Sequence, residues 1–262
     1  MHADIGVGLV HRRLALVDLR ERSNQPFWDA TRRYCLLYNG EIYDYGEIQA
    51  DLEKRGVAFR TTSDTEVLLE ALIHFGVEET LPRLEGMFAF ALYDAHEKSL
   101  VLARDRFGIK PLYVHDSEGA FAFASSANAL RPWLDLRPDA LTVSAYLQGF
   151  NGPMSGRSFF QDVSIVPPGS IVRVKLGGRA RSTPCLTMHD LVDPDLAESL
   201  AGRPRNELVD QVEHLLLKSV ESQLHADVPV GAFCSGGVDS SLIMAMAARF
   251  HGDLRVFHAD VT

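Results

Sequence analysis

Cysteine and basic residues are both scarce in this 262-residue chain. Its three cysteines, Cys35, Cys185 and Cys234, are far apart and form no C-x-x-C pair, so we expect neither a disulfide framework nor a zinc site. This cysteine usage predicts a reducing, cytoplasmic setting. Lysine and arginine number 26 against 35 acidic residues, a formal net charge of −9. Because nucleic-acid binders need a basic face, no nucleic-acid partner is expected.

Long apolar runs are also missing. No stretch approaches the roughly 18 apolar residues of a membrane span, so no membrane association is expected. Hydrophobic residues make up 46% of the sequence and charged residues 23%, which is typical of a globular protein with a sizeable core. The length favours two domains over one.

The first two thirds of the chain have the patterns of an α+β domain. Ser63 or Asp64 can cap a helix that Gly76 ends. Helices are expected at 43–56 and 63–76, and strands at 5–10, 14–18, 34–40, 86–94, 99–105, 111–116, 119–124 and 171–175. The Asn-Gly pair at the end of the strand 34–40 predicts a turn. The closely spaced later strands indicate antiparallel meanders.

A turn-rich, weakly periodic segment then separates two domains. We place the linker at 185–204, between a domain at 1–184 and another at 205–262. In the second, we expect a helix at 206–224 capped by Asn206, a strand at 228–234, a helix at 239–250 and a strand at 254–259. That order is a βαβ unit and predicts a parallel sheet.

The loop "CSGGVDSS" joins the strand and helix of that unit. A strand that opens through Gly236 and Gly237 into a helix N-terminus suits an anion, because the backbone N–H groups there are free to donate. Ser235 and Ser240 add donors. Asp239 repels a bare phosphate, so its presence favours a bridging Mg²⁺. The pattern is neither G-x-x-x-x-G-K-[ST] nor G-x-G-x-x-G.

In this setting, SGGVDS resembles the SGGxDS loop of PP-loop ATP pyrophosphatases, which cleave ATP between its α and β phosphates. The resemblance implies an ATP site at residues Cys234, Ser235, Gly236, Gly237, Asp239 and Ser240, with Asp239 as the Mg²⁺ ligand. No prosthetic group is implied.

Four earlier stretches carry a second resemblance. "HRRLALVDL" (11–19), "YNGEIYDY" (38–45), "TSDTEVLLEAL" (62–72) and "EGMFAFALYDAHEKSLVLARDRFGIKPLY" (85–113) look like the glutaminase domain of glutamine-hydrolysing asparagine synthetases. The PP-loop follows at the family's position, so the resemblance covers nearly the whole chain. It implies an N-terminal nucleophile hydrolase-type αββα sandwich, followed by the beginning of a parallel α/β domain.

The resemblance also implies roles for single residues. Arg13 matches the family's ligand for the glutamine α-carboxylate, a role that a guanidinium fork suits. Asp64 matches the partner of the α-ammonium. Asn39 and Gly40 match the oxyanion hole, and Glu41 matches a further glutamine contact. The implied overall reaction converts aspartate to asparagine through an aspartyl-AMP intermediate, with ammonia from glutamine.

The chain departs from the family in one essential residue. The family's nucleophile is a mature N-terminal cysteine whose own amino group is the base. This sequence begins Met1-His2, and Cys35 has no free amine, so we do not assign Cys35 as nucleophile. We therefore expect a chain that starts late and ends early relative to the family. Ser126 also stands where the family usually has Glu.

Two alternatives stay open. One is a related amide-forming ligase that acts on a carboxylate other than aspartate. The other is a non-catalytic module that binds glutamine or a nucleotide. The oligomeric state is also open, with a homodimer as the candidate. Arg104, Asp105 and Gly108 are expected to have a structural role or to help guide ammonia.

Overall fold

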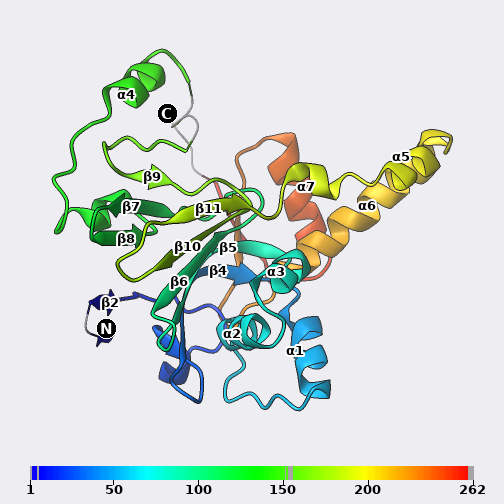
Figure 1. The fold of residues 1–262 in the computed structure, drawn as a ribbon. Helices are drawn as coiled ribbons and strands as arrows, with labels where there is room; N and C mark the ends of the chain where they lie inside the picture. The colour runs from blue at the N-terminus through cyan, green and yellow to red at the C-terminus, as the bar shows by residue number, and fades with distance from the viewer. Residues whose placement is uncertain (1, 5, 151, 153–155, 259–262) are drawn as a thin grey trace. The chain divides into compact units, whose positions relative to one another are not determined.

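The computed structural model describes residues 2–4, 6–150, 152 and 156–258 (Figure 1). The chain divides into two compact units, unit 1 with residues 1–13 and 20–190 and unit 2 with residues 14–19 and 191–262. The division after residue 190 falls inside the segment 185–204 that we predicted as linker. That segment contains the 3-10 turn η4 (Met188–Leu191) and the helix α5 (Pro194–Ala201), which Asp193 caps.

A six-stranded antiparallel sheet is the centre of unit 1. Its strands lie in the order β11-β10-β6-β5-β4-β3. They are β3 (Phe27–Trp28), β4 (Tyr34–Ile42), β5 (Gly86–Asp94), β6 (Ser99–Arg104), β10 (Ser170–Lys175) and β11 (Arg181–Pro184). β4 pairs with β5 along its whole length, from Tyr34 opposite Asp94 to Ile42 opposite Gly86. The Asn-Gly pair lies inside this ladder, so the turn predicted there is wrong.

Helices cover one face of that sheet. They are α1 (Tyr45–Lys54), α2 (Asp64–His74) and α3 (Val77–Thr80), with the 3-10 turns η1 (Glu21–Ser23) and η2 (Leu81–Arg83) nearby in the sequence. Ser63 caps α2 as predicted, since its Oγ accepts a hydrogen bond from the Thr65 amide at 3.2 Å. Leu68 and Leu69 of α2 pack with Leu36 of the sheet. Each such leucine stabilises the fold by about 1.5–3 kcal/mol on burial.

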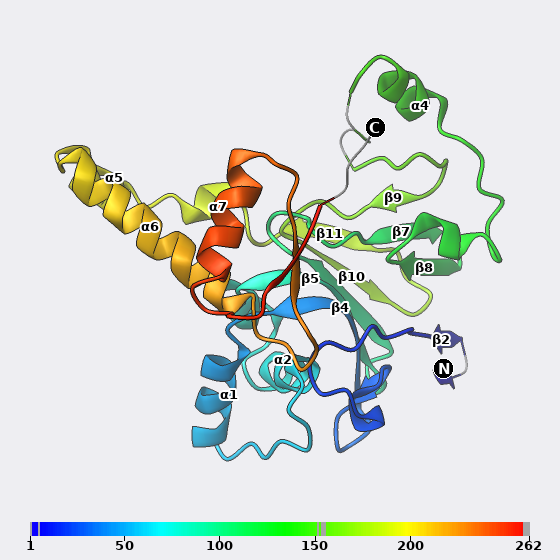
Figure 2. The ribbon, with the colours of Figure 1, turned by 180° about the vertical axis from the view of Figure 1, so that it is seen from behind.

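A smaller sheet of unit 1 lies on the side of the six-stranded sheet that faces away from these helices, as Figure 2 shows. Its order is β8-β7-β9, with β7 (Tyr113–Ser117), β8 (Ala120–Ala124) and β9 (Ser164–Ile165). A hairpin of β1 (His2–Asp4) and β2 (Val7–Leu9) adds Leu9 to the core between the sheets. η3 (Ala127–Leu130) packs on the small sheet's outer face, and α4 (Ala140–Leu147) follows. The α+β prediction is thus confirmed.

Unit 2 contains the predicted βαβ unit. α6 (Arg205–Ser222) precedes β12 (Gly231–Phe233), α7 (Val238–Ala247) and β13 (Arg255–Phe257), and the two strands pair in parallel. α6 begins at Arg205 after Pro204, so the predicted Asn206 cap is wrong. Residues 14–18 form no strand, contrary to the prediction, and Leu16 instead accepts a hydrogen bond from the Asp227 amide at 2.9 Å.

Helix packing gives unit 2 a small core. Val220 of α6 contacts Met246 and Ala247 of α7, and Arg249 is 3.1 Å from Glu213. No helix among the described residues combines the length and apolar composition needed to cross a bilayer.

Candidate functional site

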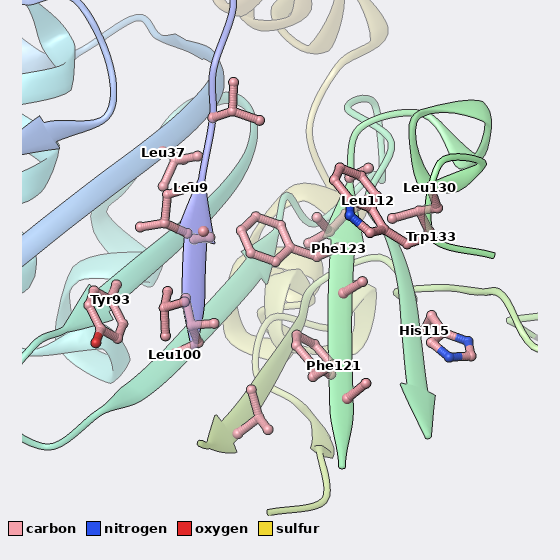
Figure 3. Close-up of a pocket in the computed structure, with 18 of the residues that line it drawn as sticks. Leu9, Leu37, Tyr93, Leu100, Leu112, His115, Phe121, Phe123, Leu130 and Trp133 are labelled. Atoms are coloured by element: carbon pink, nitrogen blue, oxygen red, sulfur yellow. The ribbon is translucent and has the colours of Figure 1, made fainter. Parts of the chain in front are cut away.

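Of the two predicted oxyanion residues, Asn39 lines a cavity of about 760 Å³ in unit 1, and Gly40 follows it on β4 but is outside that lining. Side chains alternate along a strand, so Leu37 and Asn39 face away from the helices while Tyr38 and Ile42 pack toward them. Asn39 lines the cavity together with Leu37. Figure 3 shows Leu9 and Leu37 on one side of this space and Phe121 and Phe123 on the other.

Gly40 fits β4 only because it has no side chain. A Cβ atom at this position would lie 2.1 Å from the Met87 carbonyl oxygen and 2.7 Å from the Phe88 Cα, both in the paired strand β5. Gly86 on β5 has the same steric restriction, because a Cβ atom there would lie 2.2 Å from the Glu41 carbonyl oxygen. The two glycines therefore let the strands approach closely beside Asn39.

Tyr38 is held by a side chain that the sequence analysis missed. Gln25 accepts a hydrogen bond from the Tyr38 amide at 2.5 Å and donates one to the Tyr38 carbonyl oxygen at 3.0 Å. These two bonds fix the β4 backbone next to Asn39. An isolated glutamine in "SNQPF" carries no pattern that predicts this contact.

Asp64 lies on the opposite, helix-covered side of β4. Its Oδ2 accepts hydrogen bonds from the Tyr38 hydroxyl at 2.9 Å and the Ile42 amide at 3.3 Å. Burial raises the pKa of Asp64, and these hydrogen bonds oppose the shift. The structure thus ties Asp64 to β4 but does not place it among the described residues that line the cavity.

The remaining predicted glutamine ligands are also outside that lining. Arg13 is half-buried, and its Nη1 donates a hydrogen bond to the Arg20 carbonyl oxygen at 3.4 Å. Glu41 is half-buried on the same strand as Asn39. The structure therefore joins Asn39, Gly40 and Glu41 in one strand, with Asp64 bonded to its helix side.

His11, which the sequence analysis did not single out, lines the cavity at its Asn39 end. Burial lowers the pKa of His11, an effect that the Tyr38 backbone opposes and the Arg13 charge reinforces. The imidazole is consequently neutral near pH 7. Asn39 and His11 thus bring an amide and an imidazole to the lining of the cavity.

Cys35 has none of the properties of a nucleophile. It lies on β4 with 0% of its surface exposed, and burial raises the pKa of its thiol to about 12. The thiolate is the reactive form of cysteine, so this residue is inert at neutral pH.

The segment 104–110 is built as a rigid support. Arg104 donates hydrogen bonds to the carbonyl oxygens of Lys110, Val166 and Gly108 at 2.7, 2.7 and 2.6 Å. Asp105 is fully buried, and its carboxylate accepts bonds from several backbone amides. These contacts give Arg104 and Asp105 a structural role.

The second candidate site is the loop between β12 and α7 in unit 2. Gly236 has φ +77°, a left-handed conformation that favours glycine, and Gly237 occupies the N-cap of α7. The hydroxyls of Ser235 and Ser240 are 2.9 Å apart across the loop. The N-terminal amides of α7 therefore follow directly after a glycine turn, the arrangement that binds phosphate.

The donor set of this loop suits a phosphate-bound Mg²⁺ better than a free cation. Asp239 is exposed in the first turn of α7 and offers one carboxylate. Among the described residues, no cluster of three or more His, Cys, Asp or Glu side chains could hold a metal ion. Mg²⁺ is commonly held by one or two carboxylates plus substrate phosphates, and Asp239 fits that pattern.

Two known families match this sequence, one over most of unit 1 and the other over the part of unit 2 that contains the phosphate loop. A family model described as "Glutamine amidotransferase domain" matches residues 1–183. A second, described as "Asparagine synthase", matches residues 211–262.

Individual relatives give similar matches. "Asparagine synthetase [glutamine-hydrolyzing] 1" of Bacillus subtilis is 35% identical over 97% of this chain, which covers 39% of that protein. "Amidase chyE" of Penicillium rubens is 35% identical over 94% of this chain and 36% of its own length. The chain thus spans about two fifths of the length of these relatives. A solved B. subtilis glutamine phosphoribosylpyrophosphate amidotransferase aligns with a TM-score of 0.49, 18% identity, 95% of this chain and 50% of that chain.

Proposed function

This chain belongs to the glutamine amidotransferase family and continues into a segment of the asparagine synthase family, and from that premise we propose that it serves a glutamine- and ATP-dependent ligase. In the proposed reaction, glutamine hydrolysis releases ammonia, ATP adenylates aspartate, and ammonia displaces AMP to form asparagine. Glutamine, ATP and aspartate are the proposed substrates.

Unit 1 would bind glutamine at the Asn39 end of the cavity. The observation that carries this proposal is that Asn39 faces the cavity beside the close approach of β4 and β5 at Gly40. An amide donor held on a rigid strand can stabilise the oxyanion that forms when the side-chain amide of glutamine is attacked. Arg13, Glu41 and Asp64 are proposed to hold the α-carboxylate and α-ammonium groups.

Replacing Asn39 with alanine is expected to weaken glutamine binding by about fivefold to tenfold. One neutral hydrogen bond contributes roughly 1 kcal/mol, and 1.4 kcal/mol corresponds to tenfold. Isothermal titration calorimetry of the full chain with glutamine measures the change. Asn128→Ala is the matched control, because Asn128 is exposed on η3 and does not line the cavity.

Equal affinities for wild type and Asn39→Ala would remove Asn39 from the proposed site. Absence of any glutamine binding by the wild-type chain would contradict the proposal as a whole. Ammonia release from glutamine, measured in the same samples, tests separately whether the chain supplies a nucleophile.

Unit 2 would bind ATP at the loop of Ser235, Gly236 and Gly237. The amides at the N-terminus of α7 can bind phosphate oxygens, and Cys234 and Ser240 flank the loop. Asp239 would hold Mg²⁺ together with those oxygens. The bound Mg²⁺ would neutralise phosphate charge when pyrophosphate leaves.

Substituting Asp239 with asparagine is expected to remove most of the Mg²⁺ dependence of ATP binding. Asparagine keeps the size of the side chain but loses the charge that holds the cation. Titration of the full chain with ATP, with and without Mg²⁺, gives the ratio of affinities. Asp253→Asn is the control, since Asp253 lies in the exposed turn before β13. An unchanged ratio in Asp239→Asn would contradict the assignment.

A carboxylate substrate other than aspartate is the second candidate. One relative is named an amidase, and its 35% identity to this chain equals that of the asparagine synthetase. This similarity favours the second candidate. Ser126, which replaces the usual Glu of the family, is exposed at the start of η3. Pyrophosphate exchange into ATP in the presence of different acids separates the two candidates, because only the accepted acid supports exchange.

A further inference from the structure

The backbone groups of β4 bond alternately to its two sides. In an antiparallel sheet, successive residues of a strand direct their N–H and C=O groups to opposite neighbours. The residues just outside β4 show which side comes first. The Ala95 amide donates to the Arg33 carbonyl oxygen at 2.8 Å, and the Tyr43 amide donates to the Glu85 carbonyl oxygen at 2.8 Å. Odd-numbered residues therefore bond toward β5, and even-numbered residues direct their backbone groups to the border on the side of β3.

Four of the five even-numbered residues of β4 have partners at this border. The partners are Asp29 for Tyr34, Phe27 for Leu36, Gln25 for Tyr38 and Asp64 for Ile42. One of these contacts is a strand pair, and the other three use a side chain. Side chains thus complete a border that β3, with two residues, is too short to cover.

Gly40 is the fifth even-numbered residue, and its N–H group is unpaired. Phe88 lies opposite Gly40 on β5 but bonds to Asp105 on its other side. The Phe88 amide donates to the Asp105 carboxylate at 3.3 Å, and the Phe88 carbonyl oxygen accepts from the Asp105 amide at 2.8 Å. Within the part of the chain that the structure describes, no other group bonds to the Gly40 amide. This N–H therefore points to the open border, directly after Asn39, whose side chain lines the cavity.

The path of the chain before β3 keeps this border open. The pairing of β3 with β4 has Phe27 opposite Leu36. A continuation in the same register would place Ser23 opposite Gly40 and would bond the Gly40 N–H. Instead, η1 ends at Ser23, whose amide donates to the carbonyl oxygen three residues earlier at 3.2 Å. The strand pairing thus stops early, and the Gln25 side chain makes the last bonds before Gly40.

We propose that Gln25 is a positioning residue of the glutamine site. Its carboxamide bonds both backbone groups of Tyr38 and fixes the border of β4 two residues before Gly40, without covering the Gly40 N–H. The side-chain carbonyl oxygen of glutamine then accepts hydrogen bonds from this N–H and from the Asn39 amide. A longer β3 would fix Tyr38 equally well but would also pair with Gly40. The inference rests on the proposed glutamine site and adds to it a residue that acts through the β4 backbone.

Amide hydrogen exchange of the full chain, followed by NMR, tests the geometry without a ligand. After correction for intrinsic rates, the Gly40 amide is expected to exchange at least tenfold faster than those of Tyr38 and Ile42, which have partners. Gln25→Met keeps the length of the side chain and removes both bonds, so the Tyr38 amide should exchange at least tenfold faster than in wild type. A Gly40 amide as slow as that of Tyr38, or unchanged Tyr38 exchange in the variant, would overturn the positioning role.

Two ligands separate positioning from general damage to the site. L-Norvaline has the α-groups of glutamine and the same three side-chain carbon atoms, without the carboxamide oxygen and nitrogen. In calorimetric titrations, Gln25→Met is expected to lower the affinity for glutamine about threefold to tenfold and that for norvaline less than twofold, because only glutamine offers an oxygen to the Gly40 N–H. Saturating glutamine should also slow Gly40 exchange in wild type more than in Gln25→Met. Equal losses for both ligands, or equal slowing in both proteins, would leave Gln25 a merely structural residue.

Gln148→Met is the matched control for this substitution. Gln148 is exposed at the end of α4, and its carboxamide also makes a hydrogen bond, to the Ser144 hydroxyl at 3.0 Å. The control should change neither Tyr38 exchange nor glutamine affinity. Gln25→Asn is the second variant if Gln25→Met does not fold. Its side chain is one methylene shorter and cannot bond both groups of Tyr38, so the same selective loss of glutamine affinity is expected.

Failure of this inference and failure of the proposed function give different results. A wild-type chain that binds no glutamine contradicts the glutamine site, whereas the exchange rates of Tyr38 and Gly40 still show whether Gln25 holds the border of β4. If wild type binds glutamine and Gln25→Met binds it equally well, the glutamine site stands and the role of Gln25 is excluded.

Discussion

Replacing Asp105 with alanine is expected to destabilise unit 1 by about 4 kcal/mol or more, because four backbone amides lose a charged acceptor and a hydrogen bond to a charged group contributes about 1.5–3 kcal/mol. The Asp105 carboxylate accepts hydrogen bonds from the backbone amides of Phe88 at 3.3 Å and of Phe107, Ile109 and Lys110 at 3.0 Å. Alanine leaves all four donors without their acceptor. Since both tryptophans lie in unit 1, urea unfolding followed by tryptophan fluorescence measures the loss.

The conservative variant Asp105→Asn separates shape from hydrogen bonding. Asparagine keeps one acceptor oxygen, so its loss of stability should be about half that of alanine. Asp253→Ala, at an exposed position of unit 2, should leave the transition of unit 1 unchanged. A midpoint for Asp105→Ala equal to that of wild type would show that the segment 104–110 does not depend on this carboxylate.

Gly40→Ala is expected to have a comparable effect on stability, about 3 kcal/mol or more, because a backbone clash in a packed interior cannot relax easily. The new Cβ would lie 2.1 Å from the Met87 carbonyl oxygen, so β5 would have to move away from β4. That movement also displaces Asn39, and glutamine binding should be lost even where the variant remains folded. Unfolding by urea and calorimetric titration with glutamine measure the two effects.

Gly46→Ala is the matched control for this substitution. Gly46 lies in the first turn of α1, has no heavy atom within 4 Å of an added Cβ, and is exposed. Alanine there should stabilise the helix by up to about 1 kcal/mol, since glycine is the weaker helix former. If Gly40→Ala were as stable as wild type, the close approach of β4 and β5 would have no energetic importance.

Sequence patterns predicted elements whose stability is largely local. The strand 86–94 was predicted with the bounds that β5 has, because its apolar run is flanked by clear turn signals. Ser63 caps α2 as predicted, since capping depends on residues only two positions apart. The parallel pairing of β12 and β13 followed from the order strand, helix, strand. The phosphate loop could be recognised because its residues are contiguous.

Predictions failed where distant residues decide the conformation. An Asn-Gly pair favours a turn by local preference, but nine paired residues of β5 hold Asn39 and Gly40 extended. Residues 14–18 are apolar enough for a strand, yet Leu16 bonds to Asp227 outside any sheet. Asn39 and Asp64 lie on opposite sides of β4. This arrangement requires the strand to continue past the expected turn. The roles of Arg13, Glu41 and Asp64 stay predictions.

The bond pair between Gln25 and Tyr38 has a consequence for self-association. By bonding both backbone groups of Tyr38, the Gln25 amide takes the place that a neighbouring strand residue would occupy on β4. At the opposite border of the six-stranded sheet, β11 ends in Pro184, which has no N–H to donate. Both borders are therefore poor templates for edge-to-edge polymerisation into fibrils.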